Sequence, residues 1–309
     1  MQRRDFLRST PLAAASAAGL AGTSLAQTGG APVLAKAQAD GPGPGPFPGH
    51  EPGRGIPVER QSVSRWCYGF LELEALLPRL RELGLSAIDL IRPSEFATLK
   101  AHGFTCSMAY GREQEDITTG FIDEHLHDQL VADYTAAMPK LAEYGYRNLV
   151  CFAGNRRGRY DLDGLRVAAR GLRRLMPAAR EHGVTLQMEA FNSRVNHPDY
   201  MGDSTAWLVT LVDMVDSEHF RILWDIYHMQ VQEGNVIQSI RDYGADYFGH
   251  YHTAGVPGRH ELNAEQELYY PAVMRAIRET GFEGYVAHEF VPTYEDKLAG
   301  LAEAIRICA

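Results

Sequence analysis

Short apolar runs alternate with amphipathic stretches along most of the chain, from about residue 61 to its end. Eight of these runs have the length and the β-branched and aromatic content of buried strands. They lie at residues 62–68, 87–91, 104–110, 147–154, 184–191, 220–228, 246–255 and 284–292. Each run therefore predicts one strand of a largely buried sheet.

The stretch after each run has apolar residues at helical spacing, and several stretches end in glycine, a common helix terminator. They predict helices at residues 73–84, 94–103, 163–183, 204–215, 235–244, 270–281 and 295–307, and a long helix that ends near residue 143. Strands that alternate with helices pair in parallel. Eight such units in about 250 residues predict a single (β/α)8 TIM barrel in the α/β class, with reactive groups at the carboxyl ends of its strands.

A doubly wound open sheet is the alternative fold for the same alternation of strands and helices. Such sheets usually carry a G-x-G-x-x-G motif directly after the first strand. No such motif follows residues 62–68. The closed barrel is therefore the favoured fold.

The first 60 residues lack this alternation. Residues 1–26 combine Arg3 and Arg4 with an Ala-rich apolar stretch and resemble a twin-arginine signal peptide, with a disordered basic tail as the alternative. Residues 27–60 are rich in proline and glycine and predict a disordered linker. We therefore expect a signal at 1–26, a linker at 27–60 and a barrel at 61–309, in a protein exported to the periplasm.

Composition limits the partners of the barrel. The net charge of −9 argues against nucleic acid, which requires a basic surface. No run of 18 uncharged apolar residues occurs, so no membrane span is expected after removal of the signal. A domain of this size folds without disulfides, and buried free thiols are favoured for Cys67, Cys106, Cys151 and Cys308.

Four potential metal ligands lie at the ends of the last four predicted strands, namely Glu189, Asp225, His252 and Glu289. Taken singly, each has an ordinary explanation, such as a solvated loop carboxylate or a helix cap. Neighbouring strands of a barrel lie about 4.8 Å apart, so equivalent heights on four adjacent strands bring these side chains together. Three crowded carboxylates repel one another unless a cation lies among them. The set predicts one divalent ion, and its oxygen-rich donors suit Mg²⁺ or Mn²⁺.

Four segments of the chain resemble the hydroxypyruvate isomerase family, within the broader xylose isomerase-like barrels. They are EAFNSRVNHP at 189–198, DIYHMQ at 225–230, HYHTAGVPGRHE at 250–261 and YVAHEFVP at 285–292. The resemblance implies that Glu189, Asp225, His252 and Glu289 match the metal ligands of that family. It also implies that His228 matches the family's D-x-x-H pattern, that Arg259 matches its arginine after strand seven, and that Asn192 lies in the site.

The implied reaction moves a carbonyl by one carbon in a sugar-like acid through an enediolate, with hydroxypyruvate to tartronate semialdehyde as the leading reaction. Such chemistry needs one carboxylate that takes a proton from the substrate and a second group that acts on the other face of the substrate or on its oxygen. Glu189 and Glu289 are the expected catalytic pair, and His228 and Arg259 are expected to polarise the carbonyl or bind the substrate. The substrate-binding candidates also include Arg194, His197 and Asn192, although Arg194 and His197 are equally well explained as ordinary loop residues.

Other activities remain open on the same scaffold. A ketose 3-epimerase uses similar paired glutamates on a neutral sugar, and a non-catalytic periplasmic sugar-binding protein is a further alternative. An apurinic-site endonuclease is disfavoured, because it needs more histidines at strands three and four than SMAYG and CFAGN provide. The expected partner is a small keto acid or sugar, and a homo-oligomer is possible. His260 and Glu261 are expected to anchor a loop, and Tyr227 and Tyr251 to pack the barrel.

Overall fold

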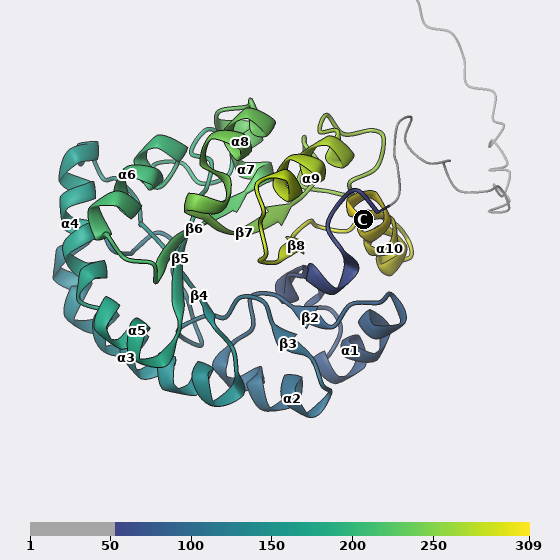
Figure 1. Ribbon diagram of the computed structural model, residues 1–309, viewed down its shortest axis with the longest axis horizontal. Helices are drawn as coiled ribbons and strands as arrows, with labels where there is room; N and C mark the ends of the chain where they lie inside the picture. Colours follow the sequence, from purple (N-terminus) through teal and green to yellow (C-terminus); the bar gives the residue numbers. More distant parts are fainter. Residues whose placement is uncertain (1–52) are drawn as a thin grey trace, which may run out of the picture. The chain divides into compact units, whose positions relative to one another are not determined.

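The eight apolar runs form parallel strands in a computed structural model that describes residues 53–309 (Figure 1). The strands are β1 Gln61–Val63, β2 Ala87–Ile88, β3 Thr105–Cys106, β4 Asn148–Cys151, β5 Thr185–Glu189, β6 Phe220–Asp225, β7 Phe248–Thr253 and β8 Val286–His288. Six pair in the order β1-β8-β7-β6-β5-β4, and β2 pairs with β3. Every one of these pairs is parallel.

Isolated backbone bridges join the two sheets into one ring. Ser64 pairs with Asp89 between β1 and β2, and Ala109 pairs with Leu149 between β3 and β4. These bridges close the eight strands on themselves, so the predicted (β/α)8 barrel is confirmed and the open sheet is wrong. Closure also makes the first and last strands neighbours, which brings distant parts of the sequence into one site.

The helices lie outside the strands and form an outer ring (Figure 1). They are α1 Leu73–Glu82, α2 Phe96–Ala101, α3 His127–Tyr144, α4 Asp161–Arg173, α5 Met176–His182, α6 Thr205–Val215, α7 Ile226–Gln232, α8 Val236–Tyr247, α9 Tyr270–Glu279 and α10 Lys297–Cys308, with short 3-10 turns η1 Val58–Arg60, η2 Arg65–Tyr68, η3 Pro93–Glu95 and η4 Glu124–Leu126. In α9, Tyr270, Val273, Met274 and Ile277 are buried at helical spacing. Within residues 53–309, no helix has both the length and the apolar character needed to cross a bilayer.

Two predicted boundaries are wrong. The helix expected at 163–183 is interrupted between α4 and α5, and Pro177 lies in the first turn of α5. Proline lacks the N–H that a helix interior needs, but the first turn leaves that group unpaired in any case. The strand expected at 220–228 ends at Asp225, whose side chain accepts a hydrogen bond from the backbone N of His228 at 3.0 Å and caps α7.

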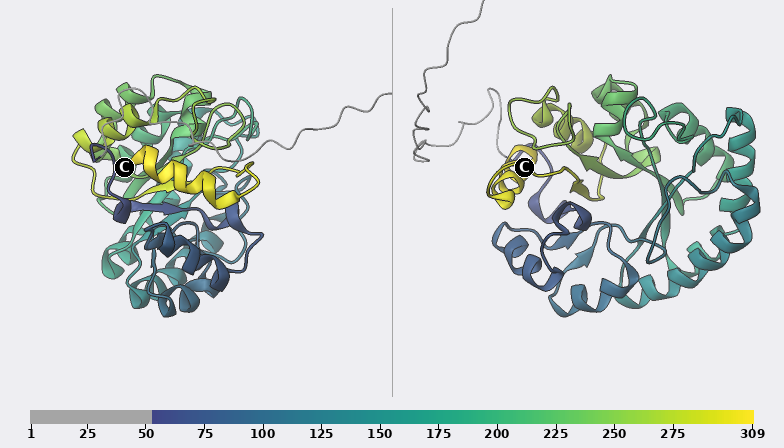
Figure 2. Two further views of the ribbon diagram at one scale, coloured as in Figure 1. Left: turned by 90° about the vertical axis from the view of Figure 1, so that its right-hand side faces the viewer. Right: turned by 180° about the vertical axis from the view of Figure 1, so that it is seen from behind.

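Residues 53–60, which the sequence assigned to the linker, pack against the barrel. The backbone N of Gly55 donates to the carbonyl of Ala309 at 2.9 Å, and that of Ile56 donates to Cys308 at 2.7 Å. Figure 2 shows α10 beside this first part of the barrel. A Cβ on Gly55 would lie 2.2 Å from the Cys308 carbonyl oxygen, so this close approach requires glycine. The predicted signal and most of the linker lie outside the described residues.

Each of the four cysteines is buried and free, as the composition indicated. Burial raises the pKa of the Cys67 and Cys151 thiols well above the ordinary value. Neutral thiols of this kind pack as small apolar side chains and are poor nucleophiles. The cysteines therefore belong to the core of the barrel.

Candidate active site

Four side chains that the sequence singled out meet at the carboxyl ends of adjacent strands. Glu189 ends β5, Asp225 ends β6, His252 lies near the end of β7, and Glu289 directly follows β8. Asp225 and His252 are paired in the register of β6 and β7. One ligand atom from each of the four lies within 4.8 Å of all the others, and all four residues are buried. The structure therefore brings them together; their role as ligands stays a prediction.

His252 lies at the centre of this group. Its Nδ1 is 2.7 Å from Glu289 Oε2, 3.3 Å from Glu189 Oε1 and 3.9 Å from Asp225 Oδ2. None of these three contacts has the geometry of a hydrogen bond. The other ring nitrogen, Nε2, is 2.9 Å from Asp89 Oδ2. One edge of the imidazole therefore faces three carboxylates, and the other edge faces a fourth.

The unpaired atoms of the group fit a bound cation. Glu189 Oε1, Asp225 Oδ2 and His252 Nδ1 are buried and have no hydrogen-bond partner. Buried polar atoms without partners are rare in folded proteins and usually indicate an unseen water or ion. Three carboxylate oxygens and one imidazole nitrogen form a donor set that suits a divalent metal ion. The group can therefore hold such an ion without rearrangement of the strands.

The electrostatics of the group favour a cation as well. Burial alone lowers the pKa of His252, but the negative charges of Glu289 and Asp89 raise it well above the usual value. The same surroundings that hold a proton on this imidazole would attract a divalent ion in its place. The guanidinium of Arg259 offsets part of this negative charge, because its Nη2 lies 2.6 Å from Glu289 Oε2 and 3.5 Å from Asp225 Oδ2.

The two glutamates have opposite acid–base character. Burial, with the nearby charge of Glu289, raises the pKa of Glu189. Burial also acts on Glu289, but Arg259 and His252 hold its pKa well below the ordinary range. Two carboxyl groups whose environments shift their pKa values apart are the arrangement that paired acid–base chemistry requires.

Arg259 follows β7 and is enclosed by two aromatic rings. Its guanidinium carbon lies 5.2 Å from the ring centre of Trp66 and 5.6 Å from that of Tyr227. Its Nη2 binds Glu289, whereas its Nε is buried and has no partner. The rings limit the orientations of the guanidinium and leave one N–H donor free toward the site. Tyr227 therefore contacts a predicted site residue and does more than pack the barrel.

His228 is held in one tautomer by Asn192. The amide oxygen of Asn192 accepts from the backbone N of Val195 and Asn196, which fixes the amide orientation, and its Nδ2 donates to His228 Nδ1 at 2.6 Å. His228 must then carry its proton on Nε2, which is buried and has no partner. Burial lowers the pKa of His228 well below the usual value, so this ring is a neutral N–H donor.

His197 and Arg194, the two predicted anion-binding residues in the loop after β5, have different locations. His197 lines the cavity, and its ring centre lies 4.4 Å from that of Phe191 and 5.1 Å from that of His228. Burial lowers the pKa of His197 to about 4, so it is uncharged near neutral pH. Arg194 is exposed and is not among the residues that line the cavity. Of these two, only His197 is placed to touch a small ligand.

A cavity of about 180 Å³ opens beside the four clustered side chains. It is lined by Trp66, Leu90, Tyr110, Ile117, Phe152, Glu189, Phe191, His197, Arg259 and Glu289. Cavities for drug-sized ligands measure about 300–1,000 Å³. This smaller space, with apolar walls and a few polar groups at one end, suits a molecule of only a few carbon atoms.

Sequence reasoning missed two residues of this region, Trp66 and Asp89. Trp66 donates from its indole Nε1 to Glu289 Oε1 at 2.6 Å. Asp89 is fully buried, and although burial opposes ionisation, the neighbouring His250 and His252 hold its pKa well below the usual range. One feature of the sequence could have identified Asp89: it is a carboxylate inside the apolar run at 87–91. A charge buried in a strand needs polar partners, so such a residue indicates a polar site nearby.

The loop after β7 is anchored by the residues that the sequence assigned to that task. Glu261 accepts hydrogen bonds from the backbone N of Thr293 and Tyr294 and from the Thr293 hydroxyl. The His260 ring bonds the carbonyl of Val291 at 3.0 Å. These contacts connect the loop that carries Arg259 to the segment after β8. They fix the height at which the Arg259 side chain enters the site.

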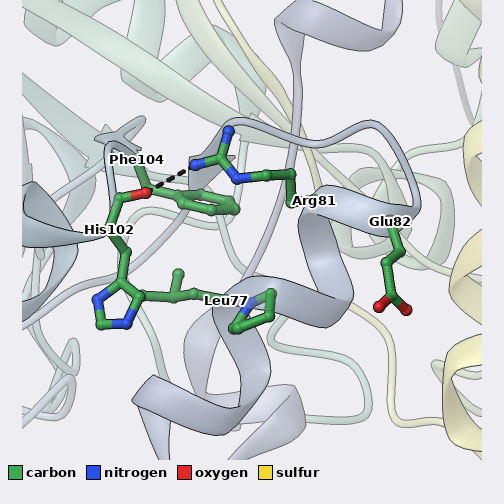
Figure 3. Close-up of a pocket in the computed structure, with 6 residues that line it drawn as sticks. Leu77, Arg81, Glu82, His102 and Phe104 are labelled. Carbon is green, nitrogen blue, oxygen red and sulfur yellow. Dashed lines mark hydrogen bonds between the residues drawn. The ribbon is translucent and has the colours of Figure 1, made fainter.

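A second hollow of about 290 Å³ lies between α1 and the start of β3 (Figure 3). Leu77, Pro78 and Phe104 give it apolar walls. The Arg81 guanidinium lies 4.8 Å from the Phe104 ring centre and donates to the His102 carbonyl at 2.6 Å. The hollow lies at the amino ends of the strands, whereas barrel enzymes place their chemistry at the carboxyl ends. It is therefore not the candidate active site.

Comparison with known families and proteins supports this assignment of the fold. The family model described as "Xylose isomerase-like TIM barrel" matches residues 73–308. A human protein named "Putative hydroxypyruvate isomerase" is 31% identical over 115 residues, which are 37% of this chain and 41% of the human protein. A "2-oxo-tetronate isomerase" from Pectobacterium atrosepticum is 31% identical over 111 residues, 36% of this chain and 41% of that protein. The chain thus matches about two fifths of the length of these relatives.

Solved structures share the fold at lower identity. An AP endonuclease, family 2, from Brucella melitensis superposes with a TM-score of 0.68 at 22% identity, covering 80% of this chain and 98% of that one. A 3-keto-D-glucoside 4-epimerase from Escherichia coli superposes with a TM-score of 0.68 at 20% identity, covering 81% of this chain and all of that one. At this level of identity the likeness extends to the barrel only, because one barrel supports many activities.

Proposed function

Because the chain belongs to the xylose isomerase-like TIM-barrel family, we propose that it is a metal-dependent isomerase of a small hydroxylated keto acid. The leading reaction is hydroxypyruvate to tartronate semialdehyde through an enediolate. The observation that carries this proposal is the buried cluster of Glu189, Asp225, His252 and Glu289, whose ligand atoms lie within 4.8 Å of one another beside one small cavity. The names of the two relatives, a putative hydroxypyruvate isomerase and a 2-oxo-tetronate isomerase, support it.

The proton transfers are assigned to the two glutamates. Ionised Glu289 takes the proton from the hydroxyl-bearing carbon next to the carbonyl, and the electron pair forms the enediolate. Glu189 then gives a proton to the former carbonyl carbon, while the hydroxyl proton moves from one oxygen to the other. Proton exchange with solvent afterwards ionises Glu289 and protonates Glu189 again. General acid–base catalysis of this kind contributes about 10²- to 10⁴-fold in rate. The product is the aldehyde isomer, and no oxidant or reductant is consumed.

The remaining residues of the cluster hold and orient the proposed metal site. His228, which the sequence assigned to polarising the carbonyl, does not line the cavity; the Nε2 of its neutral ring lies 3.7 Å from Asp225 Oδ2, and we assign it to orienting that carboxylate. Glu189, Asp225, His252 and Glu289 are the proposed metal ligands, with Mg²⁺ or Mn²⁺ as the expected ion. Such an ion would supply positive charge that stabilises the enediolate oxygens.

The acidic character of the substrate follows from Arg259. This residue lines the cavity, and its unpaired Nε–H is available to a carboxylate. A neutral ketose has no group that needs this charge. The proposal therefore favours a keto acid over the neutral sugars on which 3-epimerases act.

The activity assay uses the purified protein, first stripped with EDTA and then supplied with Mn²⁺ or Mg²⁺. Hydroxypyruvate, a 2-oxo-tetronate and a panel of neutral ketoses are offered, and products are identified by NMR. We expect turnover of a keto acid that depends on added metal and is lost in Glu189→Gln and Glu289→Gln. Glu303→Gln is the matched control, because this glutamate lies in α10, outside the site, and accepts a hydrogen bond from Tyr294. Turnover of ketoses alone would indicate an epimerase, and full activity in either site variant would refute the assignment.

We also propose that the protein acts in the periplasm after removal of residues 1–26. The paired Arg3 and Arg4 support a twin-arginine route, which carries folded proteins. Replacement of both arginines by lysine should retain the protein in the cytoplasm on cell fractionation. Unchanged export of this variant would refute the route.

A further inference from the structure

Asp89, directly after β2, is a buried carboxylate that the proposed reaction does not use. Its side chain is fully buried, and four polar groups surround its two oxygens, of which all but His250 form hydrogen bonds with it. They are the hydroxyl of Ser107 at 2.7 Å, that of Ser64 at 3.3 Å, His250 Nε2 at 3.0 Å and His252 Nε2 at 2.9 Å. A buried carboxylate with this many partners is stable in one orientation.

The backbone of Asp89 is fixed as well. Its N donates to the carbonyl of Val63 at 2.8 Å, and its carbonyl accepts from Arg65 N at 2.9 Å. These are the contacts that close the ring between β1 and β2. The carboxylate therefore has little freedom to follow a moving imidazole, and the imidazole must adapt to the carboxylate.

The contact with Asp89 decides the tautomer of His252. An ionised carboxylate only accepts hydrogen bonds, so the proton shared with it must belong to His252 Nε2. The lone pair of the neutral ring then lies on Nδ1, which faces Glu189, Asp225 and Glu289. Without this partner, the ring could carry its proton on Nδ1. That nitrogen would then have no lone pair for an ion held by the three carboxylates.

We infer that Asp89 is a positioning residue that holds His252 as an Nδ1 ligand of the divalent ion. The inference rests on the proposed metal-dependent function. It adds to the metal site a residue that directly follows β2. Carboxylates that bind the second nitrogen of a ligand histidine fix its orientation and raise its basicity, and their loss lowers metal affinity by about 10- to 100-fold. Asp89 does not touch the proposed substrate and acts only through His252.

A second ion between Asp89, His250 and His252 is the competing interpretation, since these three residues could also hold a metal. His252 Nε2 forms a direct hydrogen bond to Asp89 Oδ2 at 2.9 Å, whereas His250 Nε2 lies 3.0 Å from Oδ1 without the geometry of a hydrogen bond. The hydroxyl groups of Ser64 and Ser107 donate to the same carboxylate, which leaves it well supplied with donors. These contacts favour one ion with a supporting carboxylate.

The first test measures Mn²⁺ binding by electron paramagnetic resonance on the metal-free protein, without substrate. We expect one ion per chain in the wild type and a dissociation constant about 10- to 100-fold higher in Asp89→Asn. The matched control is Asp123→Asn, because Asp123 is also a buried aspartate, 2.8 Å from Arg157 and outside the cluster. Equal affinity of Asp89→Asn and the wild type would overturn the inference, as would two ions per wild-type chain.

A second measurement does not depend on whether Asp89→Asn folds. Long-range ¹H–¹⁵N NMR of the Zn²⁺-loaded wild type, with His252 assigned by its loss in His252→Gln, should show a proton on Nε2 and metal on Nδ1. The opposite tautomer would overturn the inference. Absence of any Mn²⁺ binding by the wild type would instead refute the metal centre of the proposed function together with it. Inactivity toward keto acids, with Mn²⁺ bound as expected, would refute only the proposed substrate.

Discussion

Trp66 donates a hydrogen bond of 2.6 Å from its indole Nε1 to Glu289 Oε1, although 223 residues separate the two in sequence. The contact exists because β1 pairs with β8 when the barrel closes. The indole ring also lies beneath the guanidinium of Arg259, at 5.2 Å. One side chain thus supports both the proposed proton acceptor and the proposed carboxylate-binding group.

Trp66→Phe separates these two contacts, because it removes the N–H and keeps an aromatic ring near Arg259. A hydrogen bond to a charged group contributes about 1.5–3 kcal/mol, and the lower end applies here since Trp66 is 39% exposed. We expect kcat to fall about tenfold, with a smaller change in KM, on the substrate that the activity assay identifies. The control is Trp207→Phe, whose indole bonds the carbonyl of Asp161 outside the site. An unchanged kcat in Trp66→Phe would show that Glu289 does not need this donor.

Replacement of Arg259 tests the charge of the substrate. Arg259→Lys keeps the positive charge but loses the planar set of donors that binds a carboxylate at two points. We expect KM for hydroxypyruvate to rise about tenfold in Arg259→Lys and further in Arg259→Met. Any slow turnover of a neutral ketose should not show this rise in KM. Similar changes for acid and neutral substrates would mean that Arg259 does not bind the substrate carboxylate.

Metal binding should stabilise the fold without being required for it. Mn²⁺ at 100 times its dissociation constant adds about 2.7 kcal/mol to the free energy of unfolding. For a barrel of this size the melting temperature should rise by about 5 °C, measured by calorimetry. Asp225→Asn should abolish this rise, because it removes one proposed ligand charge. The idea fails if wild type and variant respond to Mn²⁺ alike.

His288 should give the fold a dependence on pH that is separate from the site. It lies between Thr253 and Gln61, its ring nitrogens are 3.0 Å and 2.9 Å from their side chains, and burial lowers its pKa to about 3. The unfolded chain protonates this ring below about pH 6.5, whereas the folded chain does not. The unfolded state then binds more protons, so stability falls as the pH falls below 6.5.

The His288 effect is measured by urea unfolding at pH 7.5 and 5.0. Relative to His288→Gln, the wild type should lose about 2 kcal/mol between these two values. Gln has no group that titrates in this range, so the difference isolates the imidazole. Parallel losses in the two proteins would show that His288 is protonated in the folded state.

Much of the barrel could be predicted from hydrophobic periodicity, because every strand is buried and every helix has one apolar face. The break between α4 and α5 was harder to predict, since the apolar spacing continues across it and only Pro177 indicated the interruption. The end of β6 was missed because Ile226 and Tyr227 are as apolar as the strand before them. Both are buried in α7, and the capping contact of Asp225 decides the boundary.

The clustered carboxylates and His252 could be predicted because they end consecutive strands. Trp66 and Asp89 were missed, because they follow β1 and β2, near the other end of the barrel sequence. Their partners lie 223 and 163 residues away in sequence, and no local spacing connects them. Arg194 was a candidate because of its charge, but charge in a loop does not determine which way the loop faces.

The central claim is that Glu189, Asp225, His252 and Glu289 hold one divalent ion. It is tested most directly by crystals of the wild-type protein grown with Mn²⁺ and measured at the manganese absorption edge. The account predicts a single strong anomalous peak bounded by these four side chains, with ligand distances of about 2.0–2.3 Å. A map without a peak there, or with manganese bound only elsewhere, would contradict it.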